Sequence, residues 1–156
     1  LISSNYSTKK LYLKSYAVKP FEEMCAEAMA LGITIKAGST YRSYNYQNNL
    51  YNHYVKKDGI DKADTYSARP GYSEHQLGLA IDISNGSEFI EDGSDEYNYI
   101  INNSYKYGFI LRYPKGKENI TGYMFEPWHI RYLGIDVATY LHDNNLTYEE
   151  YIGKKN

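Results

Sequence analysis

The stretch Ser73-Glu-His-Gln-Leu-Gly-Leu-Ala-Ile-Asp82 places an imidazole, His75, before a short β-capable run and a carboxylate, Asp82, within that run. Residues 79–83 are predicted to form a central strand, which the Asn-Gly turn signal at 85–86 ends. Two small residues in the stretch let the loop return tightly. The imidazole and the carboxylate can therefore converge on one ion.

Outward from this strand, the chain predicts helices on both sides, most of them marked by apolar residues at three-to-four spacing or by capping residues. The expected helices are residues 20–31, 44–57, 59–67, 94–106 and 136–142. Further strands are expected at residues 33–37, 109–113 and 123–132. The predicted fold class is α+β, with a small mainly antiparallel sheet flanked by helices and the metal site in a cleft on the sheet.

One more helix start is expected near the end of the sequence. Thr147 and Glu150 have the spacing of a capping box, in which each side chain bonds to the other residue's backbone N–H. Leu146 and Tyr151 flank the box and can form a hydrophobic staple.

The length and the cysteine count indicate one ordinary domain. A chain of 156 residues can bury a core without disulfides. We expect a single domain over residues 1–156, with residues 1–14 interpreted as a linker remnant. Cys25 is the only cysteine, which excludes a disulfide within the chain and a cysteine-ligated structural zinc site. Its apolar helical neighbours indicate an inert core thiol.

Charge and hydropathy argue against two classes of partner. The formal net charge is -2, from 17 basic and 19 acidic residues, and no basic stripe marks a nucleic-acid partner. No apolar run approaches the roughly 20 residues needed to cross a bilayer. Because the sequence begins at Leu1 rather than at Met, we expect that an upstream signal or membrane anchor is missing from it. The 20 tyrosines either cover a wet core or line a groove for sugars or peptides.

A second motif, Glu126-Pro-Trp-His129, adds another carboxylate and another imidazole. Pro127 removes a ladder donor and makes the strand irregular, so Glu126 and His129 can both point into one site. Two imidazoles and one carboxylate suit a tetrahedral zinc ion with an open fourth position, which is typical of a catalytic site. Each motif alone also fits a loop histidine or a core ion pair, but their joint occurrence favours a metal site.

At these residues the sequence closely resembles the D-alanyl-D-alanine carboxypeptidases of the vancomycin-resistance type, whose superfamily also includes lysostaphin and the hedgehog signalling domain. The pattern Ser-x-His-x-x-Gly-x-Ala-x-Asp stands at residues 73–82, and Glu-Pro-Trp-His stands at residues 126–129. The similarity spans roughly residues 15–153. Its other matching segments are Tyr41-Arg42-Ser43 with Gln47, residues 70–72 and residues 107–114.

The resemblance implies one zinc ion bound by His75, Asp82 and His129, with catalysis by Glu126. It implies a zinc metallopeptidase that removes the C-terminal D-alanine from peptidoglycan stem peptides. In such a reaction Glu126 takes a proton from the attacking water and returns it to the departing amine. A substrate-facing Arg42 is expected to stabilise the oxyanion.

Other side chains near the motifs are expected to contact the substrate. Ser73 and Gln47 could help Arg42 to bind the terminal carboxylate, but Ser73 also fits a turn cap and Gln47 an exposed helix position. Tyr72 and Trp128 could pack against the D-alanine methyl group or form walls of the metal cavity. A further carboxylate, at Glu74, is expected to meet the amino group of the peptide's diamino acid.

Three other functions fit the same residues. An L,D-carboxypeptidase that trims the tetrapeptide, or an endopeptidase that cuts inside the stem, would use the same zinc, base and arginine. A zinc-stabilised wall-binding module is the non-enzymatic alternative, but a structural zinc site needs no base such as Glu126. In every case we expect a monomer outside the cytoplasm of a bacterium, at the cell wall or on the exterior face of its membrane.

Overall fold

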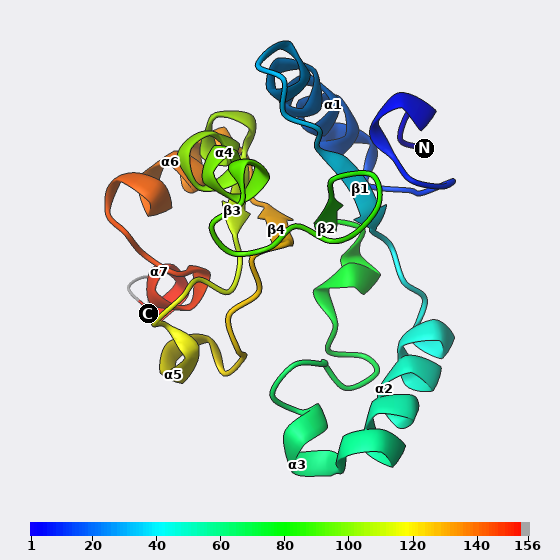
Figure 1. Cartoon of the computed structure of the whole chain (residues 1–156). Coiled ribbons are helices and arrows are strands. Elements are labelled where there is room, and N and C mark those ends of the chain that lie inside the picture. The colour runs from blue at the N-terminus through cyan, green and yellow to red at the C-terminus, as the bar shows by residue number, and fades with distance from the viewer. Residues whose placement is uncertain (154–156) are drawn as a thin grey trace.

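Four short strands form one antiparallel sheet in the order β1-β2-β4-β3 (Figure 1). They are β1 (Lys36–Ser39), β2 (Ala80–Ser84), β3 (Phe109–Leu111) and β4 (His129–Tyr132). The computed structural model describes residues 1–153. The antiparallel sheet and the helices around it confirm the predicted α+β class.

The helices gather on different sides of this sheet. Figure 1 shows α2 and α3 together below the sheet, apart from α1, α4 and α6. The helices are α1 (Ser15–Ala30), α2 (Tyr44–Asp58), α3 (Ile60–Ala63), α4 (Asp95–Asn103), α5 (Glu118–Thr121), α6 (Ile135–Asp143) and α7 (Tyr148–Gly153). Single 3-10 turns are η1 (Ser4–Tyr6), η2 (Glu74–Leu77) and η3 (Ser104–Tyr107).

The predicted helices are present, but the one expected at residues 59–67 is only the single turn α3, and the one expected at 94–106 is divided into α4 and η3. Helix α1 begins at Ser15, so Pro20 lies inside the helix rather than in its first turn. Pro20 lacks the N–H that would bond to the preceding turn. The helix continues because Ala17 and Phe21, on either side of the proline, are fully buried in the core. Burial of this apolar face outweighs one missing hydrogen bond.

Three strands are shorter than predicted, and β3 ends at Leu111 rather than at Tyr113. Strand β1 begins at Lys36, and β4 covers only the last four residues of the segment 123–132. Before β4 the chain makes a turn in which the His129 N–H donates to the Glu126 carbonyl oxygen at 3.4 Å. Pro127 lies within this turn and has no N–H to offer to a ladder, so the strand starts only after it.

One face of the sheet packs on the hydrophobic core, and the other carries polar side chains. Ile81, Ile83 and Ile130 are fully buried against the core. Because side chains alternate along a strand, Asp82 and His129 point to the opposite face. The register of β2 and β4 pairs these two residues directly with each other. The core is completed by side chains of α1 and α4: Phe21, Met24, Cys25, Ala28, Tyr99 and Ile100.

A bulge at Gly38 brings the end of β1 to the same point of the sheet. The register of β1 and β2 shifts between Ala37 and Ser39, which places Ser39 opposite Asp82. A Cβ atom on Gly38 would lie 2.7 Å from a ring carbon of Phe89. Glycine is therefore required for the close approach that forms the bulge.

The two ends of the described chain pack on the rest of the fold. Residues 1–14, which the sequence suggested as a linker, contribute Ile2 and Leu11 to the buried core. At the other end, α6 and α7 form a smaller apolar cluster on β3 around Ile110 and Leu141. In residues 1–153 no helix has the length and apolar character needed to cross a membrane.

Candidate metal centre

The three predicted ligands meet at one point on the polar face of the sheet. His75 Nε2 and His129 Nδ1 each lie 3.3 Å from Asp82 Oδ1. The two imidazole rings are 4.9 Å apart and nearly perpendicular, at 82°. All three side chains are buried, and their ligand atoms lie within 4.8 Å of one another. This arrangement leaves room for one ion between two nitrogens and one oxygen.

Local structure explains how His75 reaches this point. It lies in η2, whose first turn is capped by the Ser73 hydroxyl, which accepts the His75 N–H at 3.3 Å. Gly78 ends the turn in the left-handed conformation, at φ +69°, which glycine adopts without steric cost. The Gly78 carbonyl oxygen accepts a hydrogen bond from the Lys14 N–H at 2.9 Å, which fixes the return of the loop.

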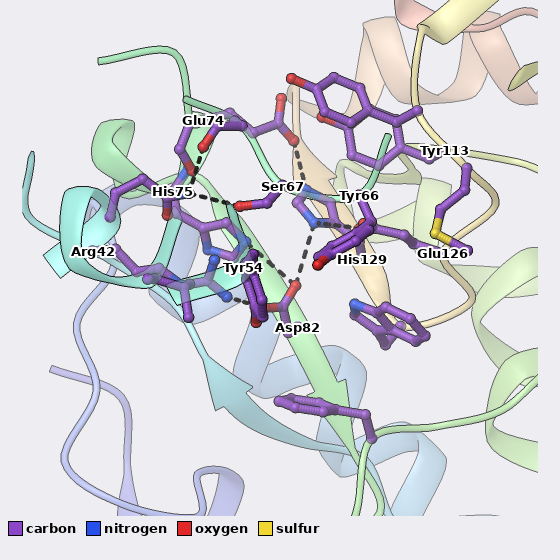
Figure 2. A pocket seen from close by; sticks show the side chains of 18 residues that line it. Arg42, Tyr54, Tyr66, Ser67, Glu74, His75, Asp82, Tyr113, Glu126 and His129 are labelled. Carbon is purple, nitrogen blue, oxygen red and sulfur yellow. Dashed lines mark hydrogen bonds and ion pairs between the residues drawn. The ribbon is translucent and has the colours of Figure 1, made fainter. Parts of the chain in front are cut away.

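Each imidazole is held by a partner on its other nitrogen. His75 Nδ1 lies 2.7 Å from the carbonyl oxygen of Thr40. His129 Nε2 lies 2.8 Å from Glu74 Oε1. Such partners fix the ring orientation and the tautomer of metal-binding histidines. His75 Nε2 and His129 Nδ1 are thereby left to face the cleft (Figure 2).

The Asp82 carboxylate fits a metal ligand. Its Oδ2 accepts a hydrogen bond from Arg42 Nη2 at 2.6 Å. Its Oδ1, which faces both imidazoles, is buried and has no hydrogen-bond partner among residues 1–153. Burial alone would raise the pKa of Asp82, but the imidazoles of His75 and His129 hold it well below its usual value. An anionic oxygen and two imidazole nitrogens are a ligand set that suits zinc.

Three carboxylates surround His129. Burial would lower the pKa of this imidazole, but Asp82, Glu126 and Glu74 raise it well above its usual value. Glu74 is itself buried, which would raise its pKa, but His129 and two arginines lower it to about 2. The Asp82 and Glu74 carboxylates therefore stay charged and make this corner of the cleft strongly attractive to a cation.

Glu126, the predicted general base, lies beside the ligands. Its Oε2 is 3.3 Å from His129 Nδ1. The turn that joins Glu126 to His129 places both side chains on the cleft, and the Glu126 N–H donates to the Tyr113 carbonyl oxygen at 3.1 Å. The Glu126 side chain is largely buried, and its carboxylate meets the cleft beside the ligand cluster.

The ligands lie in a cleft of about 390 Å³. Helix α2 and the segment after α3 form one wall, with Leu50, Tyr54 and Tyr66 facing the cleft. Other lining residues come from the segment after β2, from the residues after β3 and from the segment before β4. The aromatic and apolar residues among them are Phe89, Tyr113, Tyr123, Met124 and Trp128. Figure 2 shows these side chains around the three ligands.

Four of the other predicted site residues also line this cleft: Arg42, Gln47, Ser73 and Trp128. Arg42 is held at Asp82 and by Ser39 Oγ, which accepts from Nε and Nη2 at 3.2 and 3.1 Å. Gln47 is 1 % exposed, so it is not a surface residue of α2. Its Nε2 donates to the Ala68 carbonyl oxygen at 2.7 Å, and its Oε1 has no hydrogen-bond partner in the described part of the chain.

Two expectations need correction. Tyr72 is 82 % exposed and is not among the cleft residues. Its N–H closes a turn onto the Arg69 carbonyl oxygen, and this turn directs the ring into solvent. Glu74, expected to meet a substrate amino group, instead has both carboxylate oxygens engaged within the protein. Its Oε1 meets His129, and its Oε2 accepts from Arg112 Nε and Arg131 Nη1 at 3.0 and 2.9 Å.

The sequence did not reveal the residues that support the ligands. Thr40 orients His75 through its backbone, which no side-chain pattern reports. Arg131 stands two residues after His129 on β4, and this alternation could have placed it on the same face. Glu149, which pairs with Arg112 at 2.6 Å, comes from α7, and no sequence motif marks it as part of the site.

Comparisons with known proteins agree with this geometry. Residues 10–135 match the family described as VanY: D-alanyl-D-alanine carboxypeptidase. The D-alanyl-D-alanine carboxypeptidase of Enterococcus faecalis is 37% identical over 145 residues, which cover 86% of this chain and 54% of that protein. The chain spans about half the length of the first curated relatives that it matches, between 44% and 55%.

Solved structures share the fold over almost the whole chain. The LdcB LD-carboxypeptidase superposes with a TM-score of 0.84 at 38% identity and covers 99% of this chain and 79% of its own. A variant of the vancomycin-resistance D,D-pentapeptidase VanY, in complex with Zn(II), superposes with a TM-score of 0.80 at 34% identity. That match covers 97% of this chain and 93% of the VanY chain.

Proposed function

Because the chain belongs to the VanY family of D-alanyl-D-alanine carboxypeptidases, we propose that it is a zinc-dependent D,D-carboxypeptidase that removes the C-terminal D-alanine from peptidoglycan stem peptides. The observation that carries the proposal is the position of Glu126, 3.3 Å from His129 and beside the His75, Asp82 and His129 cluster. A site that only stabilises the fold has no use for a further carboxylate beside the three ligands.

His75 Nε2, Asp82 Oδ1 and His129 Nδ1 would hold the zinc ion. When bound, zinc supplies a Lewis acid that polarises the scissile carbonyl and activates water at neutral pH. The protein already orients all three ligand atoms through Thr40, Arg42 and Glu74. Such partners keep the ligands in place without a rearrangement on binding.

Glu126 would act as the proton carrier. One carboxylate oxygen takes a proton from the attacking water and then gives it to the nitrogen of the departing D-alanine, so that the new carboxylate and the free amine are both formed. The low exposure of Glu126 and the aromatic walls of the cleft keep bulk water away from this proton.

Arg42 would face the substrate carboxylate or the developing oxyanion. Its Nε and Nη2 are engaged by Ser39 and Asp82, which fix the guanidinium plane. The guanidinium has further N–H groups, on Nη1, that can donate to an anionic oxygen. Gln47 Oε1 and the Ser73 hydroxyl offer further polar contacts on the same cleft.

A second candidate is an L,D-carboxypeptidase that trims the tetrapeptide. The observation in its favour is the identity to LdcB, 38%, which is higher than the 34% identity to the VanY structure. Both reactions need the same ligands, base and arginine. The aromatic end of the cleft, away from the ligands, would decide which stem peptide fits.

Purified zinc-loaded protein, incubated with stem pentapeptide, tetrapeptide and tripeptide in separate reactions, would test both candidates. Mass spectrometry should show loss of one alanine from the pentapeptide and no change in the tripeptide. If only the tetrapeptide is shortened, the protein is an L,D-carboxypeptidase and not a D,D-carboxypeptidase. If none of the three peptides is shortened while zinc is bound, the carboxypeptidase proposal is wrong.

We also propose that the protein works as a monomer outside the cytoplasm, where its substrate lies. Light scattering on a size-exclusion column should give the mass of one chain. Fractionation of the source cells should place the full-length protein with the wall or the exterior membrane face. Recovery in the cytoplasmic fraction would contradict this location.

A further inference from the structure

Helix α7 lies beyond residue 135, where the match to the family ends, but it contacts the charged residues behind His129. Glu149 Oε1 lies 2.6 Å from Arg112 Nη2. The ring of Tyr148 lies 5.3 Å from the guanidinium carbon of Arg112 and 5.7 Å from that of Arg131. The helix therefore holds both arginines, one by an ion pair and both by a ring face.

From the arginines the contacts lead directly to a proposed metal ligand. Arg112 Nε and Arg131 Nη1 both donate to Glu74 Oε2, and Glu74 Oε1 meets His129 Nε2. The side chains of Glu74 and of the two arginines are only 10–11% exposed, so solvent screens these interactions weakly. Glu149, Arg112, Glu74 and His129 thus form one continuous chain of contacts.

The charges in this network balance only when Glu149 is included. Two guanidinium groups, of Arg112 and Arg131, face two carboxylates, of Glu74 and Glu149. Without the charge of Glu149, both guanidinium groups would share the single carboxylate of Glu74. The stronger pull on Glu74 would draw its other oxygen away from His129 Nε2 and loosen the orientation of that ring.

We propose that Glu149 is a positioning residue, through which α7 holds His129 in the orientation needed to bind zinc. This proposal rests on the proposed function in one respect only, namely that the bound metal is zinc. It assigns Glu149 no contact with the substrate. The effect of Glu149 passes through Arg112 and Glu74, so the C-terminal helix is part of the metal site although it lies outside the family match.

The test measures zinc affinity, by competition with a chromogenic chelator on metal-stripped protein. Glu149→Gln keeps the shape of the side chain and removes its charge. We expect it to weaken zinc binding by about two- to thirtyfold, the range of a coupling transmitted through a network. Glu74→Gln, which acts on the ligand directly, should weaken it by about 10- to 100-fold. Glu23→Gln, on the exposed face of α1, is the control for net charge and should leave the affinity unchanged.

A double-mutant cycle shows whether Glu149 acts through Glu74. If it does, Glu149→Gln should have little further effect on zinc affinity in the Glu74→Gln background. Equal effects in both backgrounds would overturn the proposal. So would a Glu149→Gln protein whose metal-free melting temperature falls while its zinc affinity stays at the wild-type value, because Glu149 would then stabilise only the fold.

A second variant keeps the test valid if Glu149→Gln folds poorly. Arg112→Lys keeps the positive charge but cannot bond both carboxylates with a planar fork. It should lower zinc affinity in the same direction, and wild-type affinity in this variant would contradict the proposed route. None of these measurements uses a peptide substrate, so they remain informative even if the protein proves not to cleave D-alanine.

Discussion

At the scale of single residues, Glu126 is expected to act in catalysis but not in zinc binding. Its carboxylate lies beside the ligand cluster without belonging to it. Glu126→Gln should therefore retain one zinc ion per chain and lose about 10²- to 10⁴-fold in turnover, because only the proton carrier is removed. Metal analysis and release of D-alanine from the pentapeptide would check this. Glu118→Gln, on exposed α5, is the matched control, and near wild-type turnover in Glu126→Gln would disprove the role.

For His129 we expect that substitution removes zinc binding as well as activity. His129→Ala removes one of three ligands and leaves Glu74 without its imidazole partner, so zinc and activity should be lost together. The same result is expected for His75→Ala. His53→Ala, on the exposed surface of α2, should keep both properties. Full zinc content in either ligand variant, measured after dialysis, would show that the ligand set is wrong.

The ligands could be predicted from the sequence because each motif is local. Six positions separate His75 from Asp82, and Glu126 reaches His129 within one turn. Glu74 was misread for the reverse reason. Its partners Arg112 and Arg131 stand 38 and 57 residues further along the chain and meet it only in the folded sheet. Nothing in the neighbourhood of Glu74 distinguishes such a buried carboxylate from one that faces the substrate.

At the scale of elements, the capping box of α7 is confirmed. The Thr147 N–H donates to Glu150 Oε2 at 2.7 Å, and the Glu150 N–H donates to Thr147 Oγ1 at 3.1 Å. Glu150 also meets Lys117 of the segment before α5 at 3.3 Å. The sequence signal succeeded here because both partners lie within one helical turn, and the distant Lys117 binds Glu150 without displacing Thr147.

This box should make the stability of the protein depend on pH. The hydrogen bond from Thr147, and then the charge of Lys117, lower the pKa of Glu150. A lowered pKa stabilises the fold above the unfolded value, near 4.3, and this contribution is lost as the pH falls through the folded value. Urea unfolding should show wild type more stable than Glu150→Gln at pH 7, with the difference shrinking below about pH 4. A difference independent of pH would contradict the assignment.

Helix starts were harder to predict than helix interiors. The start of α1 at Ser15 depends on the Lys14 N–H bonding to Gly78, which lies in a different segment. The sequence around Pro20 favoured a start at the proline, because proline suits a first turn. Tertiary contacts overrode this local preference. Strand ends show the same limit, since β4 shortens where the turn at Pro127 is completed by Tyr113.

At the scale of the whole molecule, metal binding should be coupled to folding. The three ligands come from η2, β2 and β4, which are brought together only in the native sheet. Zinc at 100 times its dissociation constant should stabilise the native state by about 2.7 kcal/mol. Thermal unfolding with zinc and with a chelator would measure this as a shift of several degrees. An unchanged melting temperature would mean that these residues bind no zinc.

Cys25, the single cysteine, lies in the core on the side of the sheet opposite the metal ligands. Burial, and then the charge of Glu22, raise the pKa of Cys25 far above its usual value. The native protein should therefore not react with a thiol reagent at pH 8, and the reaction should begin only when denaturant unfolds the core. Fast labelling of native protein would show that α1 opens from the sheet. Absence of labelling after full unfolding would show that the thiol had been modified beforehand.

The direct pairing of Asp82 with His129 has a consequence for how the chain reaches its final form. A slip of β4 by one residue against β2 would turn His129 into the core and Ile130 out to the cleft. Such a misfolded sheet could not bind a metal ion through these side chains. Binding of the ion would thus stabilise the correctly aligned sheet over the misaligned one. In a cell short of zinc, some chains would be inactive because they lack the ion, and others because β4 is misaligned.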